Sequence, residues 1–175
     1  KGYVDLTLKI LEMAGIEVKN NDYKSFLIKG NQTYKGFNYT VEGDYSQVAF
    51  WIVAGILSEE INCKNVYKDS LQGDRAIVEI VQRMGANLEI NDKNIKVFPG
   101  KTKGTVIDVS QCPDIAPVLT VLAALSEGET RIINAERLRI KESDRITSMR
   151  TELNKLGADI REEGDTLVIN GVDEL

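Results

Sequence analysis

The 175-residue sequence contains no histidine and only two cysteines. Without histidine, Ser-His-Asp and Cys-His nucleophile systems are excluded, as are the imidazole ligands of most zinc sites. Cys63 and Cys112 form no CxxC pair, so they indicate neither a structural zinc site nor a disulfide framework, which fits a reducing compartment. Any acid–base chemistry must therefore come from Asp, Glu, Lys or Tyr.

The sequence also lacks a run of 18 apolar residues and an excess of positive charge. The first absence argues against a membrane span, which needs roughly 20 such residues. The net charge of −5 argues against nucleic acid as a partner, since a nucleic-acid-binding face is basic. Hydrophobic content of 42% and charged content of 28% are ordinary for a globular protein. We expect a cytoplasmic protein with a small anionic ligand.

One short segment is dense in charge, with four cations and two acids between residues 137 and 145. A helix is predicted to follow it, with Ser143 as the cap and Asp144 in the first turn. Lys141 and Arg145 would then bracket a helix N-terminus, where backbone N–H groups and the helix dipole favour anions. The segment predicts a site for a phosphorylated or carboxylated small molecule, with one acid, Glu142, inside it. A solvated charge run at a helix start is the alternative.

The rest of the chain is repetitive. Three stretches share the order helix, glycine, strand, polar turn, strand, glycine. The helix-ending glycines Gly15, Gly85 and Gly157 lie 70 and 72 residues apart. The closing glycines follow 15, 15 and 14 residues later, at Gly30, Gly100 and Gly171. Repetition at a nearly fixed period is a signal of fold.

A second repeat, at an offset of 68 residues, is interleaved with the first. Residues 47–57 and 115–125 are both almost wholly apolar, and Ser-Glu follows each of them. Helices that are apolar on every side are buried on every side, so both segments predict core helices. Phe50 and Trp51 are accordingly predicted to lie in the core.

The two repeats together define a unit of strand, buried helix, strand, amphipathic helix, strand and strand. Two such units are expected over residues 39–100 and 105–171, and the first 30 residues are expected to be the tail of an earlier unit. The predicted fold class is α/β, with repeated βαβαββ units around buried helices. Both ends of the sequence fall between repeat elements, so we expect a fragment of a larger enzyme.

Five segments resemble the EPSP synthase (3-phosphoshikimate 1-carboxyvinyltransferase) family and occur in the family's order. They extend over nearly the whole chain, and the Lys-Glu-Ser/Thr-Asp-Arg string is specific to the family. The segments are residues 1–5 (KGYVD), 41–44 (VEGD), 70–74 (SLQGD), 113–116 (PDIA) and 138–145 (LRIKESDR).

The resemblance implies a division into domains. The family has two domains, each an inside-out α/β barrel of three βαβαββ units about a pseudo-threefold axis. Residues 1–41 would be the tail of the N-terminal domain, and residues 42–175 would be two of the three units of the C-terminal domain. The pseudo-threefold arrangement would therefore be incomplete here. We expect this chain to be inactive alone and the full-length protein to be a monomer.

The resemblance also implies an activity, enolpyruvyl transfer from phosphoenolpyruvate to shikimate 3-phosphate with release of phosphate, without metal or organic cofactor. This reaction belongs to aromatic amino acid biosynthesis. Asp114 matches the carboxylate that contacts the shikimate ring and accepts a proton. Glu142 matches a carboxylate beside phosphoenolpyruvate, and Arg145 matches a phosphoenolpyruvate ligand. Lys141 and Tyr3 match residues that lie at shikimate 3-phosphate.

The chemistry asks for residues of these types. The attacking hydroxyl is not acidic, so a positioned carboxylate such as Asp114 must take its proton. Protonation of the enolpyruvate methylene needs an acid, a role open to Glu142 if burial raises its pKa. Phosphate and carboxylate groups are bound by Lys and Arg. Arg137 stands where the family commonly has Asn, so no role is assigned to it.

Alternatives remain open for the residues and for the chain. Asp114 after Pro113 is also typical of an acid in the first turn of a helix, and an aromatic such as Tyr3 is also typical of packing. The sister family that transfers enolpyruvate to UDP-N-acetylglucosamine shares the fold but lacks the specific string. A non-catalytic fragment of the same fold is a third possibility.

Overall fold

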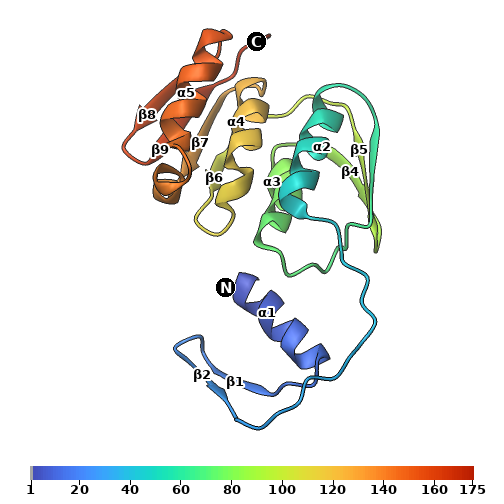
Figure 1. Ribbon diagram of the computed structural model, residues 1–175. Coiled ribbons are helices and arrows are strands. Elements are labelled where there is room, and N and C mark those ends of the chain that lie inside the picture. Colours follow the sequence, from blue (N-terminus) through green and yellow to red (C-terminus); the bar gives the residue numbers. More distant parts are fainter. Residues whose placement is uncertain (1) are drawn as a thin grey trace.

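The computed structural model describes residues 2–175, so Lys1, the first residue of the KGYVD segment, lies outside the described residues. Figure 1 shows a small N-terminal part and a larger part. A connection over residues 29–44, which is neither helix nor strand, joins them. The small part contains α1 (Gly2–Met13), β1 (Val18–Asn21) and β2 (Ser25–Ile28). All four residues of β2 are exposed, and none of the described residues of α1 is buried.

The larger part contains two units with the same order of elements. The first consists of α2 (Tyr45–Leu57), β3 (Ile61–Lys64), α3 (Ala76–Arg83), β4 (Asn87–Ile90) and β5 (Asn94–Phe98). The second consists of β6 (Val106–Asp108), α4 (Ala116–Ala124), β7 (Glu129–Ile133), α5 (Arg145–Lys155), β8 (Asp159–Glu163) and β9 (Thr166–Asn170). Short 3₁₀ helices precede α3, α4 and α5, at η1 (Gly73–Arg75), η2 (Pro113–Ile115) and η3 (Glu136–Ile140).

Each unit forms its own sheet. The first sheet has the order β3-β5-β4, and the second has the order β6-β7-β9-β8. Neighbouring strands are antiparallel except for the parallel pair β6 and β7. The order β7-β9-β8 repeats the order β3-β5-β4, and the predicted α/β duplication is therefore confirmed.

The predicted leading strand of the first unit does not form in the described chain. The Gly43 N–H donates to the Asn65 carbonyl at 2.7 Å, and Asn65 Nδ2 donates to the Val41 carbonyl at 3.0 Å. These contacts lie beyond the last residue of β3, because Asn65 takes a left-handed conformation (φ 61°) that ends the strand. Asn134 ends β7 in the same way (φ 56°), and its Nδ2 donates to Asp108 Oδ2 at 2.8 Å. A left-handed asparagine thus marks the same point of both units.

Three helices end at the predicted glycines. Gly15, Gly85 and Gly157 have φ values of 76°, 97° and 104°, a region in which a side chain would be strained. The chain reverses there and enters the strand that follows. This part of the repeat is confirmed.

Helices α2 and α4 lie side by side in front of the sheets (Figure 1), and the core lies between helices and strands. Helix α4 is buried almost all round, as predicted, because α2, α5 and the second sheet surround it. For α2 the prediction is wrong, because Phe50 is 50% exposed and Trp51 is 61% exposed. A helix that is apolar all round needs neighbours on every side, and within residues 2–175 α2 has α4 on one side and the first sheet beneath.

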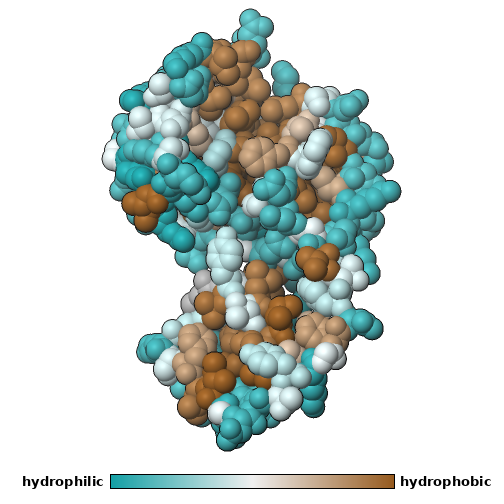
Figure 2. All heavy atoms as spheres, viewed as in Figure 1, coloured by the Kyte–Doolittle hydropathy of each residue, from teal (hydrophilic) through white to brown (hydrophobic). Residues whose placement is uncertain are grey.

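The exposed face of α2 continues into a shallow apolar groove. Figure 2 shows apolar side chains gathered on this face of the larger part. The apolar residues that line the groove come from α2, α4 and α5 and are Phe50, Val53, Ala54, Leu57, Pro117, Val118, Val121, Met149 and Leu153. Among the described residues, no helix is long and apolar enough to cross a membrane.

Candidate active site

Three segments far apart in sequence meet where the N-terminus of α1 approaches the larger part (Figure 1). A Cβ atom on Gly2 would lie 2.8 Å from the Leu71 carbonyl oxygen, and one on Gly73 would lie 2.6 Å from the Gln111 carbonyl oxygen. Glycine at both positions lets the first turn of α1, the loop before η1 and the loop before η2 stack this closely. The predicted site residues lie around this junction.

Asp114, on η2, lies at the centre of a charged cluster. Its Oδ1 accepts hydrogen bonds from Lys141 Nζ at 2.9 Å and from Arg145 Nη1 at 3.4 Å. Arg145 Nη2 also donates to Glu142 Oε2 at 2.9 Å. The side chains of Asp114, Lys141 and Arg145 are only 27–32% exposed. The structure thus brings together four of the five predicted residues, and Asp114 turns its carboxylate to two cations rather than to the helix backbone.

Tyr3, the fifth predicted residue, reaches the same place from α1. Its hydroxyl lies close enough to Asp74, a residue of η1, for the charge of that carboxylate to act on it. Burial raises the pKa of Tyr3, and the nearby charges of Asp74 and Asp114 raise it further. Tyr3 therefore places a hydroxyl of the small part near the acids of the larger part, although half of its surface is exposed.

Asp74 is a site residue that the sequence analysis did not predict. It is 5% exposed, and its Oδ1 receives no hydrogen bond from residues 2–175. Burial, followed by the charges of Asp114 and Asp44, raises the pKa of Asp74 to about 6. The only sequence signal was its position at the end of the SLQGD segment, because a single acid after a glycine carries no periodicity or charge pattern.

Glu142 differs from expectation in its protonation. Its side chain is 82% exposed, and hydrogen bonds from its own backbone N–H and from Arg145 lower its pKa. The burial that was to raise this pKa is not present in the described chain. Glu142 is therefore an ionised carboxylate at neutral pH in this arrangement.

The cap of α5 is also different from the prediction. Asp144, not Ser143, is the N-cap, and its carboxylate accepts from the backbone N–H of Thr147 at 3.2 Å and from its hydroxyl at 3.0 Å. A carboxylate is favoured at this position because it also interacts with the positive end of the helix dipole. These hydrogen bonds lower the pKa of Asp144. The cap fixes the start of the helix that carries Arg145.

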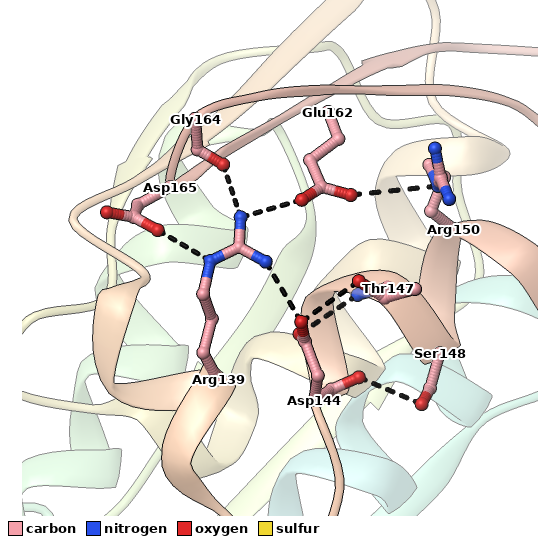
Figure 3. Close-up of polar contacts among 8 residues, drawn as sticks. All are labelled: Arg139, Asp144, Thr147, Ser148, Arg150, Glu162, Gly164 and Asp165. Atoms are coloured by element: carbon pink, nitrogen blue, oxygen red, sulfur yellow. Dashed lines mark hydrogen bonds and ion pairs between the residues drawn. The ribbon is translucent and has the colours of Figure 1, made fainter.

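Arg139 holds the loop that carries Lys141 and Glu142 (Figure 3). Its guanidinium donates to Asp144 Oδ2 at 3.0 Å, Glu162 Oε1 at 2.6 Å and Asp165 Oδ1 at 2.7 Å, and also to the Gly164 carbonyl. One side chain thus ties η3, the cap of α5 and the hairpin between β8 and β9 together. The hydrogen bonds to Asp165 and Glu162 raise the pKa of Arg139 further. In the sequence this arginine is one of the four cations of the charged segment, a pattern that indicates no individual role for it.

The fold has a counterpart among solved structures. It is similar to the solved structure of the enolpyruvyl transferase NikO from Streptomyces tendae, with a TM-score of 0.77 over 97% of this chain and 40% of that chain. Sequence identity is 19%, so this likeness concerns the fold alone. The chain has the fold of an enolpyruvyl transferase.

The sequence comparisons identify the family. The family model of EPSP synthase (3-phosphoshikimate 1-carboxyvinyltransferase) matches residues 1–175, and the chain belongs to this family. The 3-phosphoshikimate 1-carboxyvinyltransferase of Clostridium perfringens is 60% identical over 176 residues, which cover 100% of this chain and 42% of the relative. A solved EPSP synthase from Acinetobacter baumannii is 29% identical, with a TM-score of 0.80 over 94% of this chain and 40% of that chain. The chain spans about two fifths of the length of the curated relatives it matches, and the resemblance drawn from the five segments is confirmed.

Proposed function

We propose that the full-length protein containing this chain transfers the enolpyruvyl group of phosphoenolpyruvate to shikimate 3-phosphate and releases phosphate. The observation that carries the proposal is the half-buried cluster in which one carboxylate, that of Asp114, faces two cations, Lys141 and Arg145. The family match over residues 1–175 supports the same reaction.

Each residue of the cluster has a part in this proposal. Asp114 takes the proton of the attacking hydroxyl as the new carbon–oxygen bond forms and the tetrahedral ketal appears. Lys141 binds shikimate 3-phosphate as a point charge, with Tyr3 beside it, and Arg145 grips phosphoenolpyruvate through its planar fork. Elimination of phosphate, with loss of a proton from the methyl carbon of the ketal, then regenerates the double bond.

Glu142 can act as the acid of this reaction only if its carboxyl group is protonated. As an acid for the enolpyruvate methylene it must hold a proton, so substrates and neighbouring protein must exclude water and raise its pKa. With the carboxylate ionised, as in the exposed arrangement, it orients Arg145 through the 2.9 Å hydrogen bond. The two roles differ in the protonation state of one group.

We also propose the domain assignment and the setting of the full-length protein. Residues 1–41 form the tail of the N-terminal domain, and residues 42–175 form two of the three units of the C-terminal domain. The lack of a core in α1 and β2 supports the first assignment, and the confirmed duplication supports the second. The protein is a cytoplasmic monomer that acts on small molecules rather than on nucleic acid, which the net charge of −5 supports.

Asp114→Asn in the full-length protein tests the proposed reaction. Phosphate release from phosphoenolpyruvate should require shikimate 3-phosphate in the wild type. The variant should lose about 10²–10⁴-fold in kcat, because an amide cannot accept the hydroxyl proton. Shikimate 3-phosphate binding and melting temperature should change little, since Asn keeps the shape and an acceptor oxygen.

The matched control is Asp92→Asn, which alters an exposed Asp–Lys pair, with Lys68 as the partner. It should leave kcat unchanged. A normal kcat for Asp114→Asn with a slightly lowered melting temperature would show that Asp114 is only an acid at a helix start, and the proposal would be wrong.

A further inference from the structure

Gly73 is a glycine for reasons of space rather than of backbone conformation. Its φ is not positive, so its backbone conformation is open to other residues. A Cβ atom there, however, would lie 2.6 Å from the Gln111 carbonyl oxygen, which is closer than Cβ atoms come to a neighbouring atom in proteins. Ordinary van der Waals contact begins at 3.4 Å, so any side chain at this position must push two backbone segments apart. The absence of a side chain therefore sets the spacing between the start of η1 and the loop before η2.

The start of η1 is tied to α2, so it does not retreat freely from an added side chain. The Gln72 side chain accepts a hydrogen bond from the Tyr45 backbone N–H at 2.8 Å and donates one to the Gly43 carbonyl at 2.9 Å. Both partners lie at the N-terminus of α2, and Tyr45 is fully buried. Retreat of η1 would strain two partly buried hydrogen bonds, which is costly. A side chain on residue 73 would therefore displace the loop before η2 instead.

A displacement of the loop before η2 is transmitted to Asp114. Gln111 lies three positions before Asp114, and the buried Pro113 stands between them. The Cys112 backbone N–H donates to the Val109 carbonyl at 3.2 Å, which closes the loop on itself. The proline ring fixes one backbone torsion angle, so it joins this closed loop to η2 with little slack. The loop and the aspartate therefore move together.

The cations that face Asp114 would not follow this movement. Lys141 and Arg145 belong to a different segment, which the Arg139 guanidinium and the Asp144 cap hold in place. The Asp114 carboxylate lies 2.9 Å from Lys141 Nζ and 3.4 Å from Arg145 Nη1. A shift of η2 alters both distances. The spacing at the start of η1 therefore determines the geometry of the charged cluster.

We propose that Gly73 is a positioning residue of the site, which fixes the distance of the Asp114 carboxylate from the two cations and from the substrate hydroxyl. The inference rests on the proposed function, because Asp114 takes a proton only if that function holds. A displacement of about 1 Å in a reacting group costs up to about 100-fold in rate. The role predicts a loss in kcat rather than in binding, since the cations that bind the anionic substrates stay in place.

Gly73→Ala in the full-length protein tests this role. It should lower kcat about 10- to 100-fold and change the KM for either substrate less than about 3-fold. The matched control is Gly100→Ala, because a Cβ atom on Gly100 meets no atom within 4 Å and the φ of Gly100 is not positive. The control should keep the wild-type kcat. A merely structural role would lower the melting temperature of Gly73→Ala and leave the kcat of the folded protein unchanged.

A double variant asks whether Gly73 acts through Asp114. In the Asp114→Asn background the base is already absent, so Gly73→Ala should change the remaining kcat less than about 2-fold. Equal fold losses in the two backgrounds would show that Gly73 acts on another group, and the inference would be wrong. A wild-type kcat for Gly73→Ala, or a rise in both KM values without a loss in kcat, would overturn it as well.

Gln72→Ala tests the same spacing from the side of η1 and decides the matter if Gly73→Ala yields no folded protein. It removes the tie to α2, so the loop before η2 loses the support of η1. It should lower kcat about 3- to 10-fold with both KM values near those of the wild type, and only when Asp114 is present. An unchanged kcat for Gln72→Ala would then overturn the inference. A wild type without shikimate-3-phosphate-dependent phosphate release would instead overturn the proposed function, and the inference with it.

Discussion

Lys141 and Arg145 share the Asp114 carboxylate, yet they approach it with different chemistry. Lys141 presents a single ammonium at 2.9 Å. Arg145 presents a planar fork, one nitrogen of which faces Asp114 while another faces Glu142. A fork matches a carboxylate in bidentate fashion, whereas an ammonium acts as a point charge. The two cations should therefore not be interchangeable toward two different anionic substrates.

Separate alanine variants of the full-length protein measure this difference. Arg145→Ala should weaken phosphoenolpyruvate more than shikimate 3-phosphate, and Lys141→Ala should do the reverse. Loss of a charged donor costs roughly 1.5–3 kcal/mol, or about 10- to 150-fold in affinity. Titration of each variant with both ligands measures these affinities. Lys68→Ala, which removes a surface cation, is the control. Equal weakening of both ligands by both variants would refute the separate roles, and a solvated charge run predicts almost no effect.

Asp74 also makes stability depend on pH. Its folded-state pKa of about 6 lies above the ordinary value of 3.8, so the fold favours the protonated form. Its contribution is complete below pH 4 and is lost as the pH rises through 6, by up to about 3 kcal/mol. Asp74→Asn cannot ionise, so the variant should be more stable than the wild type at pH 8 but not at pH 4.

Urea unfolding at the two pH values measures the effect. Asp92→Asn provides a control of opposite sign, because the hydrogen bond from Lys68 lowers the pKa of Asp92. That variant should lose a little stability at pH 8 and none at pH 3. An Asp74→Asn variant that is less stable than the wild type at pH 8 would mean that ionised Asp74 stabilises the fold.

At the residue level, the charge pattern predicted that Lys141, Glu142 and Arg145 lie together, but it did not predict the protonation state of Glu142. Lys141, Glu142 and Arg145 are close in sequence, so a helix start was enough to group them. The placement of Asp114 in the same site came from the family resemblance, and its ion pairs with Lys141 and Arg145 were not predicted, because nothing in the local pattern brings residues 27 and 31 positions apart into contact. The exposure of Glu142 depends on the packing of its loop, which no periodicity records.

At the level of elements, Arg139 determines how rigidly that loop is held. Three carboxylates and one carbonyl receive its hydrogen bonds, and they come from the cap of α5 and the β8–β9 hairpin (Figure 3). A single guanidinium can make this set of contacts because its donors are fixed in one plane, whereas a lysine cannot. We therefore expect the position of Lys141 and Glu142 to depend on Arg139, which precedes them in the chain.

Arg139→Met and Arg139→Lys in the full-length protein should both lower kcat/KM, because small displacements of binding groups cost up to about 100-fold. The lysine variant should recover only a minor part of the loss. Arg150→Met is the matched control, since Arg150 touches the same Glu162 only at 3.7 Å and from α5. Steady-state kinetics with both substrates measures the effect. A kcat/KM near that of the wild type for Arg139→Met would show that the loop keeps its shape without the guanidinium.

Helices and strands were predictable where the same residue pattern recurs along the sequence. Left-handed glycines after α1, α3 and α5 recur at a nearly fixed period, as do the more apolar strands β2, β5 and β9, and each was found where expected. The missing leading strand of the first unit was not predictable, because it depends on where β3 ends at Asn65. The exposure of Phe50 and Trp51 was not predictable either, since burial depends on neighbours that a single helix sequence does not reveal.

At the scale of the whole molecule, the chain contains the cluster but, under the proposed domain assignment, little of the N-terminal domain. The small part contributes Tyr3 and an α1 without a buried residue among those described. The 175-residue chain alone should therefore give no phosphate release that depends on shikimate 3-phosphate, because much of the rate of such a reaction comes from positioning two substrates. Assay of the purified chain against a boiled control checks this expectation. Activity above the control would show that the cluster alone is sufficient.

The apolar groove along α2, α4 and α5 also affects the solubility of the purified chain. Copies of a protein stay apart in solution partly through mutual charge repulsion, and an exposed apolar face works against it. The isoelectric point is about 4.9, so repulsion vanishes under mildly acidic conditions. Turbidity should therefore rise steeply as a concentrated sample is dialysed toward pH 5, and added salt should aggravate the precipitation at neutral pH. Purification and storage belong well above that pH and at low ionic strength.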